Sequence, residues 1–231
     1  MLAEEIFEGN FVTDALAIRQ KLLRIKAFIF DWDGVFNDGR KDINGNSGFS
    51  EVDSMGVNMM RFSYYLLHKQ LPASVILTGE NNSLAISFAK RENFDCVFYK
   101  TANKKLALDY LCEQRNISAE EVLFVFDDVL DFSVAQLAGV RCMIGHANNS
   151  LLTRFAIDKA LVDYITKRDG NDYAVREVSE LVMMLSGNFE KTIENRMHFS
   201  DLYKQYFELR KSVATDLFFS KDHRIIKDIN I

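Results

Sequence analysis

The sequence contains very little proline and cysteine. Pro72 is the only proline in 231 residues, whereas average usage of about 5% would give roughly a dozen. A proline-rich linker between domains is therefore absent. The three cysteines, Cys96, Cys112 and Cys142, are odd in number and form no Cys-x-x-Cys pair. Cysteines this few and this far apart exclude a disulfide scaffold and favour a reducing cytoplasm.

Long apolar runs and an excess of basic residues are also missing. The longest apolar runs, such as residues 27–30 and 181–185, are far shorter than the roughly 20 residues that a membrane-spanning helix needs. The net charge is -5, from 28 Lys and Arg against 33 Asp and Glu, so nucleic acid and anionic membranes are poor candidate partners. Glu4, Glu5 and Glu8 lie near the start without a basic stretch, so we expect no signal peptide.

The remaining composition is that of a soluble globular protein. About 48% of the residues are apolar and 26% are charged, which is ordinary for this class. A chain of 231 residues can bury about 70% of its unfolded surface, so it needs neither disulfides nor a structural metal in order to fold. The length allows one large domain, or one domain with an appendage.

Short apolar runs alternate with helical patterns along the chain. Strands are predicted at residues 27–30, 74–77, 95–99, 122–126 and 140–144, with 161–165 as a candidate sixth. Helices are predicted at residues 14–24, 56–70, 82–91, 104–114, 134–138 and 172–185. This alternation predicts an α/β fold, with a Rossmann-like, mostly parallel sheet and helices on both faces.

Two further segments complete the predicted architecture. Residues 35–52 are rich in Gly, Asn and Asp and contain the turn signal Asn44-Gly45-Asn46, which predicts a β-hairpin flap. Aromatic and apolar residues after Gly187 recur at helical spacing. They are Phe199, Leu202, Tyr203, Tyr206 and Phe207, and they are expected in a core or a subunit interface. We expect a helical lead-in at 1–25, an α/β core at 26–187 and a helical extension at 188–231.

Polar side chains stand where the predicted strands end. They are Asp31 and Asp33 after the first strand, Thr78 after the second, Lys104 beyond the third, and Asp127, Asp128 and Asp131 after the fourth. In a parallel α/β sheet, ligands bind beyond the carboxyl ends of the strands. Clustered carboxylates repel one another unless a cation or proton intervenes. Oxygen ligands favour Mg²⁺, which also bridges phosphate groups, so the sequence predicts a Mg²⁺ and phosphate site.

These residue types are sufficient for phosphoryl transfer. Asp31 can attack phosphorus and form an aspartyl-phosphate, and Asp33 can protonate the leaving oxygen and then activate water. Thr78 can donate a hydrogen bond to phosphoryl oxygens, while Lys104 offsets their charge. Mg²⁺ would screen the approach of an anionic nucleophile to an anionic phosphate.

The order of these residues resembles the four motifs of the haloacid dehalogenase (HAD) superfamily. The matching stretches are Phe30-Asp31-Trp32-Asp33-Gly34-Val35, Leu77-Thr78-Gly79, Lys104, and Asp127-Asp128-x-x-Asp131. Other stretches of the sequence are similar to the 3-deoxy-octulosonate 8-phosphate phosphatase branch of this superfamily. The nine-carbon relatives in that branch act on ketodeoxynononate or acylneuraminate 9-phosphates. The similar stretches are Asp33-Gly34-Val35-Phe36-x-Asp38-Gly39, Asp53-x-x-Gly56, Asn103-Lys104 and Ala174-Val175-Arg176-Glu177. The resemblance covers about residues 24–187.

The resemblance implies a fold, a cofactor and a set of roles. It implies a HAD-like catalytic core without a large cap domain, Mg²⁺ as cofactor, and a homotetramer in which flaps close neighbouring sites. Asp31 is then the nucleophile and Asp33 the acid/base, and Asp31, the Asp33 main-chain carbonyl and Asp127 hold the metal. The other implied roles are catalysis by Thr78 and Lys104, substrate or phosphate binding by Trp32, Gly79, Glu80 and Asn103, and support of the ligands by Asp128 and Asp131.

Three positions depart from the branch. Glu80 stands where the octulosonate enzymes have arginine; this resembles the nine-carbon branch, but the basic residue that accompanies it there is Phe88 here. Phe126 replaces a glycine before the fourth-motif aspartate, and residues 170–173 keep a glycine-rich pattern only in part.

The expected activity is hydrolysis of a small phosphate ester, such as an eight- or nine-carbon 2-keto-3-deoxy sugar acid phosphate. Phe126, Glu80 and the aromatic extension motivate an alternative, a catalytically weak HAD-like subunit that serves as a binding or regulatory partner. A receiver-type signalling domain fits less well, because its acidic pair follows the first strand, whereas the pair Asp127-Asp128 follows the fourth predicted strand here.

Lys105 is an alternative candidate for the role of Lys104. His146 can face the site, although an exposed loop histidine is the expected interpretation.

Overall fold

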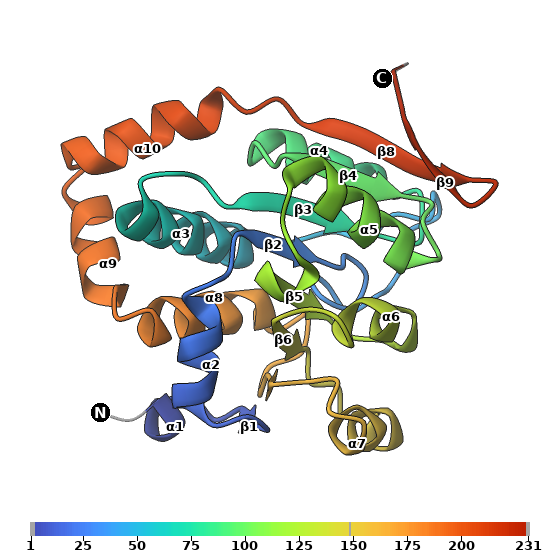
Figure 1. Ribbon diagram of the computed structural model, residues 1–231, viewed down its shortest axis with the longest axis horizontal. Helices are drawn as coiled ribbons and strands as arrows, with labels where there is room; N and C mark the ends of the chain where they lie inside the picture. Colours follow the sequence, from blue (N-terminus) through green and yellow to red (C-terminus); the bar gives the residue numbers. More distant parts are fainter. Residues whose placement is uncertain (1–2, 148, 230–231) are drawn as a thin grey trace.

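Five short apolar strands form the centre of the sheet. They are β2 (Ala27–Phe30), β3 (Ala73–Leu77), β4 (Cys96–Tyr99), β5 (Val122–Phe126) and β6 (Val140–Met143). They pair in parallel in the order β6-β5-β2-β3-β4. All are almost wholly buried, as expected of mostly apolar strands that are covered on both faces. The computed structural model describes residues 3–147 and 149–229 (Figure 1).

Alternate residues of each strand pack on opposite faces of the sheet. Phe28 and Phe30 of β2 face a core cluster built with α2 (Ala15–Leu22), α3 (Glu51–His68), α4 (Ser83–Arg91) and α8 (Ala174–Leu185). Ala27 and Ile29 face a second cluster built with α5 (Lys104–Arg115), α6 (Phe132–Ala135) and α7 (Ser150–Asp158). The predicted α/β sheet with helices on both faces is confirmed. No helix within residues 3–147 and 149–229 has the length and apolar character of a membrane span.

The N-terminal segment is only partly helical. Between α1 (Ala3–Ile6) and α2, strand β1 (Asn10–Phe11) pairs antiparallel with β7 (Tyr164–Ile165) at one edge of the sheet.

Two single turns of 3-10 helix flank β5, at Ala119–Glu121 and Val129–Asp131.

The C-terminal extension is helical only in its first half. After α9 (Phe189–Met197) and α10 (Asp201–Lys211), the chain forms β8 (Asp216–Lys221) and β9 (Arg224–Lys227). Strand β8 pairs in parallel with β4, which makes β9 an edge of the nine-stranded sheet in the described chain (Figure 1). Asp222 and His223 both have positive φ, as a two-residue hairpin turn requires. The expectation of helix throughout 188–231 is therefore wrong for these strands.

Of the aromatic residues of the extension, Tyr203 and Tyr206 belong to a core, whereas Phe199 is 57% exposed. Tyr203 and Tyr206 of α10 are buried against Phe62 of α3, and the Tyr206 hydroxyl contacts the Asn58 backbone oxygen and side-chain Oδ1 at 3.1 Å. A buried ion pair of 2.8 Å joins Arg210 to Glu92 at the end of α4. The extension is thus tied to the same layer of helices that covers the sheet.

The predicted flap contains no strand in residues 35–50, and α3 begins at Glu51. The turn signal is confirmed, since Gly45 has a φ of +79° and Asp42 accepts hydrogen bonds from the Asn44 and Asn46 amides. Asn37 holds the two ends of the segment together by donating to the carbonyls of Trp32 and Gly48. The side chains of Asp42 and Asn37 thus form hydrogen bonds with backbone amides and carbonyls of this segment, which do not take part in a ladder between strands.

Candidate functional site

A cavity of about 230 Å³ opens at the carboxyl ends of β2, β3 and β5. Its lining contains every predicted site residue except Trp32 and Asn103, and it adds Lys41 and Leu130. Because the three strands run in parallel, their polar C-terminal residues meet at one edge. The central expectation from the sequence, that these residues share one site, holds in the structure.

Lys104 lies at the centre of the acidic group. It is the first residue of α5, and its side chain is 3% exposed. The Nζ atom lies 2.7 Å from Asp31 Oδ1 and 2.6 Å from Asp131 Oδ1. Burial alone would lower the pKa of Lys104, but the two carboxylates hold it above its usual value. The ammonium group therefore stays charged and fixes the position of Asp31.

Asp31 is crowded by other carboxylates. Burial raises its pKa well above the usual range, and Asp131 and then Asp127 raise it further, whereas Lys104 lowers it. Burial also raises the pKa of Asp131. One ammonium group is thus insufficient for three neighbouring carboxylates, and additional positive charge at this point would stabilise their ionised forms.

The carboxylates fit a divalent cation. One oxygen from each of Asp31, Asp127 and Asp131 can be chosen so that all three lie within 4.8 Å of one another. Asp127 Oδ1 is buried and has no hydrogen-bond partner in the described chain, as expected of an oxygen placed to bind a metal ion. An added Cβ on Gly34 would lie 2.0 Å from Asp127 Oδ2, and φ at Gly34 is +84°. Glycine is therefore required beside this ligand group.

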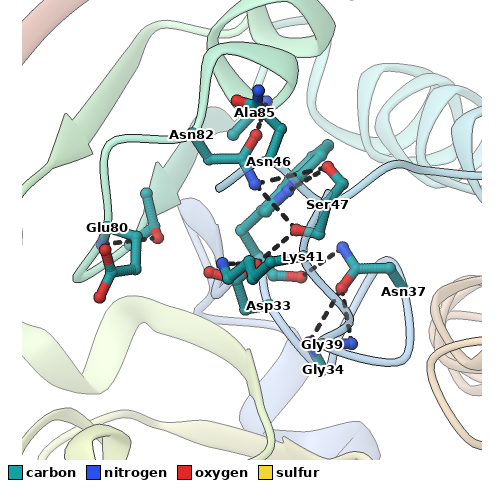
Figure 2. Close-up of polar contacts among 12 residues, drawn as sticks. Asp33, Gly34, Asn37, Gly39, Lys41, Asn46, Ser47, Glu80, Asn82 and Ala85 are labelled. Atoms are coloured by element: carbon teal, nitrogen blue, oxygen red, sulfur yellow. Dashed lines mark hydrogen bonds and ion pairs between the residues drawn. The ribbon is translucent and has the colours of Figure 1, made fainter. Parts of the chain in front are cut away.

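The group of carboxylates contains one side chain beyond the predicted metal set. The prediction used Asp31, Asp127 and the main-chain carbonyl of Asp33, with Asp131 in a supporting place. The Asp131 carboxylate lies close enough to Asp31 and Asp127 to be a ligand as well, and the role of the Asp33 carbonyl stays a prediction. The Asp33 carboxylate points to the loop, where the Ser47 hydroxyl donates to its Oδ1 and the Lys41 ammonium group pairs with the same oxygen (Figure 2).

The other predicted residues take separate places. Thr78 is buried, lines the cavity and accepts a hydrogen bond from the Glu80 amide at 3.2 Å. Glu80 is exposed at the mouth. Asp128 also lines the cavity, and its carboxylate accepts from the Val129 amide at 2.7 Å. Asn103 precedes α5 without a side-chain capping bond and lies outside the lining.

Trp32 contributes to packing through its side chain. The indole is fully buried, stacks on Phe36 and packs against Phe88. Its Nε1 donates to the Ser47 carbonyl at 3.2 Å. The prediction that Trp32 binds substrate does not hold for its side chain, because the large apolar ring is taken up by this aromatic cluster.

Phe126 does not crowd the site. Its ring is fully buried and stacks on Phe124 with 5.2 Å between centroids. It belongs to the cluster below the sheet and is not part of the cavity lining. Phenylalanine in place of glycine at this position therefore contributes to the core and leaves the cavity open.

Two residues of the site were missed or undervalued from the sequence. His146 Nε2 lies 3.2 Å from Asp127 Oδ2, and that hydrogen bond raises the pKa of His146. The expectation of an exposed loop histidine is wrong. The signal in the sequence was that His146 follows β6, which pairs with β5, the strand that ends just before Asp127. Lys41 was not singled out, because a lysine in a polar loop gives no sign that it turns inward.

The chain has clear similarity to known phosphatases. It is 27% identical over 188 residues to the 3-deoxy-D-manno-octulosonate 8-phosphate phosphatase of Escherichia coli strain K12, with 79% of this chain and 90% of that protein covered. The corresponding phosphatase of Moraxella catarrhalis, solved in complex with magnesium, phosphate and a KDO molecule, aligns with a TM-score of 0.64 at 26% identity. That alignment covers 78% of this chain and 97% of the other.

A probable YrbI-family phosphatase of Pseudomonas syringae aligns with a TM-score of 0.66 at 24% identity and covers 78% of this chain and 97% of its own. This likeness supports the fold. No model of a protein family matches the chain. The ordered motifs, the acidic cavity and these similarities identify the chain as a phosphatase of the haloacid dehalogenase superfamily that resembles the 3-deoxy-D-manno-octulosonate 8-phosphate phosphatases.

Proposed function

We propose that the protein is a Mg²⁺-dependent phosphomonoesterase that forms an aspartyl-phosphate on Asp31. The observation that carries this proposal is the buried group of Asp31, Asp127 and Asp131 around Lys104, with Asp127 Oδ1 unpartnered. Such a site can bind a divalent cation and a phosphate together. Bound Mg²⁺ would offset the negative charge of the phosphate and the nucleophile.

Each of three side chains has its own role in the proposed reaction. Asp31, held by Lys104, attacks phosphorus as the bond between phosphorus and the ester oxygen breaks. Asp33 donates a proton to the departing oxygen and afterwards removes one from the water that hydrolyses the phosphoenzyme. Thr78 lines the same cavity, which supports a role for its hydroxyl as a donor to a phosphoryl oxygen.

The proposed substrate is an eight- or nine-carbon 2-keto-3-deoxy sugar acid phosphate. The relatives at 26–27% identity carry the name of the eight-carbon activity. The lining contains six carboxylates and two lysines, and Lys104 is already engaged by Asp31 and Asp131. Lys41 pairs with Asp33 Oδ1 but its side chain is 33% exposed, whereas that of Lys104 is 3% exposed. Lys41 is therefore the lysine of the lining that a substrate carboxylate can reach.

Replacing Lys41 with alanine is expected to raise KM for sugar acid phosphates about fivefold, and to change KM for neutral hexose phosphates less than about twofold. An exposed charge pair with a carboxylate is worth about 1 kcal/mol, and 1.4 kcal/mol corresponds to a factor of ten in binding. Steady-state kinetics on both substrate classes measures this, with Lys105→Ala as control. Equal changes in both classes would contradict the assignment of Lys41.

A substrate panel tests the proposed activity. Purified protein is incubated with 3-deoxy-octulosonate 8-phosphate, nine-carbon sugar acid 9-phosphates and hexose 6-phosphates, each with Mg²⁺ or with EDTA. The proposal predicts phosphate release with Mg²⁺ and preference for the sugar acids. No release from any phosphomonoester would refute it and would leave the alternative of a catalytically weak subunit that binds a partner.

Three features of the wider assembly remain proposals. We assign the chemistry to residues 26–187, with residues 1–25 and 188–231 as additions to that core. A homotetramer is the oligomer that the resemblance implies. The cysteines Cys96, Cys112 and Cys142 are free thiols, which supports a reducing cytoplasm as the site of action.

A further inference from the structure

A chain of directed hydrogen bonds leads from the start of α4 to Asp33. Asn82, fully buried, caps α4: its Oδ1 accepts from the backbone amides of Leu84 at 3.0 Å and Ala85 at 3.2 Å. Because these amides can only donate, the other end of the Asn82 side chain must be its NH₂ group. That group donates to Ser47 Oγ at 2.8 Å (Figure 2).

The orientation of Asn82 determines where the Ser47 hydrogen goes. A hydroxyl has one hydrogen to donate, and Ser47 Oγ already accepts from Asn82. Its hydrogen is therefore directed to Asp33 Oδ1, with which it forms a short contact. Ser47 is 3% exposed, and its carbonyl accepts from the Trp32 indole at 3.2 Å. Solvent therefore has little access to this hydroxyl.

Both contacts to Asp33 from the loop fall on one oxygen. Ser47 Oγ and Lys41 Nζ each approach Oδ1. Oδ2 has no hydrogen bond or ion pair with residues 3–147 or 149–229, and Asp33 lines the cavity. A carboxylate held at one oxygen presents the other in a defined direction, and proton transfer demands such alignment with the ester oxygen.

The geometry points to Ser47 as a positioning residue for catalysis, which holds Asp33 through Oδ1 so that Oδ2 transfers the proton. This inference rests on the proposed acid/base role of Asp33. In the first step Oδ2–H gives its proton to the ester oxygen while the phosphoryl group passes to Asp31. In the second step Oδ2 takes a proton from the attacking water, which restores the starting state.

Two variants remove the directed donor. Ser47→Ala deletes the hydroxyl. Asn82→Asp keeps the shape and the helix cap, but its second oxygen can only accept, so it draws the Ser47 hydrogen away from Asp33. The control is Ser83→Ala, since the Ser83 hydroxyl ties the same loop through Asn46 at 2.8 Å without touching Asp33.

The readout is the rate of phosphoenzyme formation with two esters. A sugar phosphate has an alkoxide leaving group that needs a proton, whereas p-nitrophenyl phosphate has a leaving group that needs almost none. Both variants are expected to lower the rate with the sugar phosphate by about 10- to 100-fold, and with p-nitrophenyl phosphate by less than about threefold, at nearly unchanged KM. Ser83→Ala is expected to match the wild type with both esters.

The outcomes separate this inference from the proposed function. If the wild type forms no phosphoenzyme, or if Asp33→Asn turns over at the wild-type rate, the proposed function fails. If the wild type is active and Asp33→Asn is not, two results overturn the inference alone: equal losses with both esters, or wild-type rates in Ser47→Ala and Asn82→Asp.

Discussion

Asp31→Asn is expected to lower kcat for every phosphomonoester by at least about a thousandfold, because an amide oxygen cannot displace an alkoxide from phosphorus and form the aspartyl-phosphate. The amide has the same shape as the carboxylate, and it removes the buried charge and the carboxylate repulsion that raise the pKa of Asp31. The fold should therefore survive the change, and the loss should appear in kcat.

The measurement combines phosphate release with acid quenching of enzyme given radiolabelled substrate. Wild-type protein should retain label and Asp31→Asn should not. Asp109→Asn is the control, since Asp109 is an exposed carboxylate of α5 that pairs with Lys105. Substantial turnover by Asp31→Asn would show that another group is the nucleophile.

Lys104→Met should produce the second large effect, on both stability and activity. The change removes the ammonium group between Asp31 and Asp131, and breaking a buried ion pair from one side costs about 3–5 kcal/mol. Methionine fills similar space, so packing is largely kept. We expect the free energy of unfolding in EDTA to fall by about 3 kcal/mol, and kcat with Mg²⁺ to fall about 100-fold or more, because Asp31 is no longer held.

Lys105→Met is the matched control. Lys105 stands one residue along α5 and forms an exposed ion pair with Asp109, and such pairs contribute about 0.3–0.5 kcal/mol. Urea unfolding curves and steady-state kinetics of the two variants give the comparison. Similar small effects from both substitutions would contradict the central place assigned to Lys104.

The sheet was largely predictable because its strands carry a strong local signal. β5 was predicted with its observed bounds, since the run Val122–Phe126 is wholly apolar and bounded by polar residues. Once the order of strands and helices is recognised, parallel pairing follows, and the carboxyl ends meet at one edge. Asp31, Thr78 and Asp127 could therefore be placed together from sequence.

The parts that were not predicted depend on contacts between distant segments. β8 and β9 form because β8 pairs with β4, about 120 residues earlier, and their turn at Asp222 and His223 contains no glycine. Short apolar runs of this kind do not distinguish strand from helix. The contact between Ser47 and Asp33 likewise depends on where Asn82 brings the loop, and no spacing in the sequence encodes that geometry.

The binding of Mg²⁺ to metal-free protein is the most direct test of the central claim that Asp31, Asp127 and Asp131 hold a divalent cation. Isothermal titration calorimetry of wild-type protein and Asp127→Asn measures it. We predict one bound ion for each wild-type chain, and affinity at least about tenfold weaker in the variant because a charged ligand is lost. Wild-type protein that binds no Mg²⁺, or a variant with undiminished affinity, would contradict the claim.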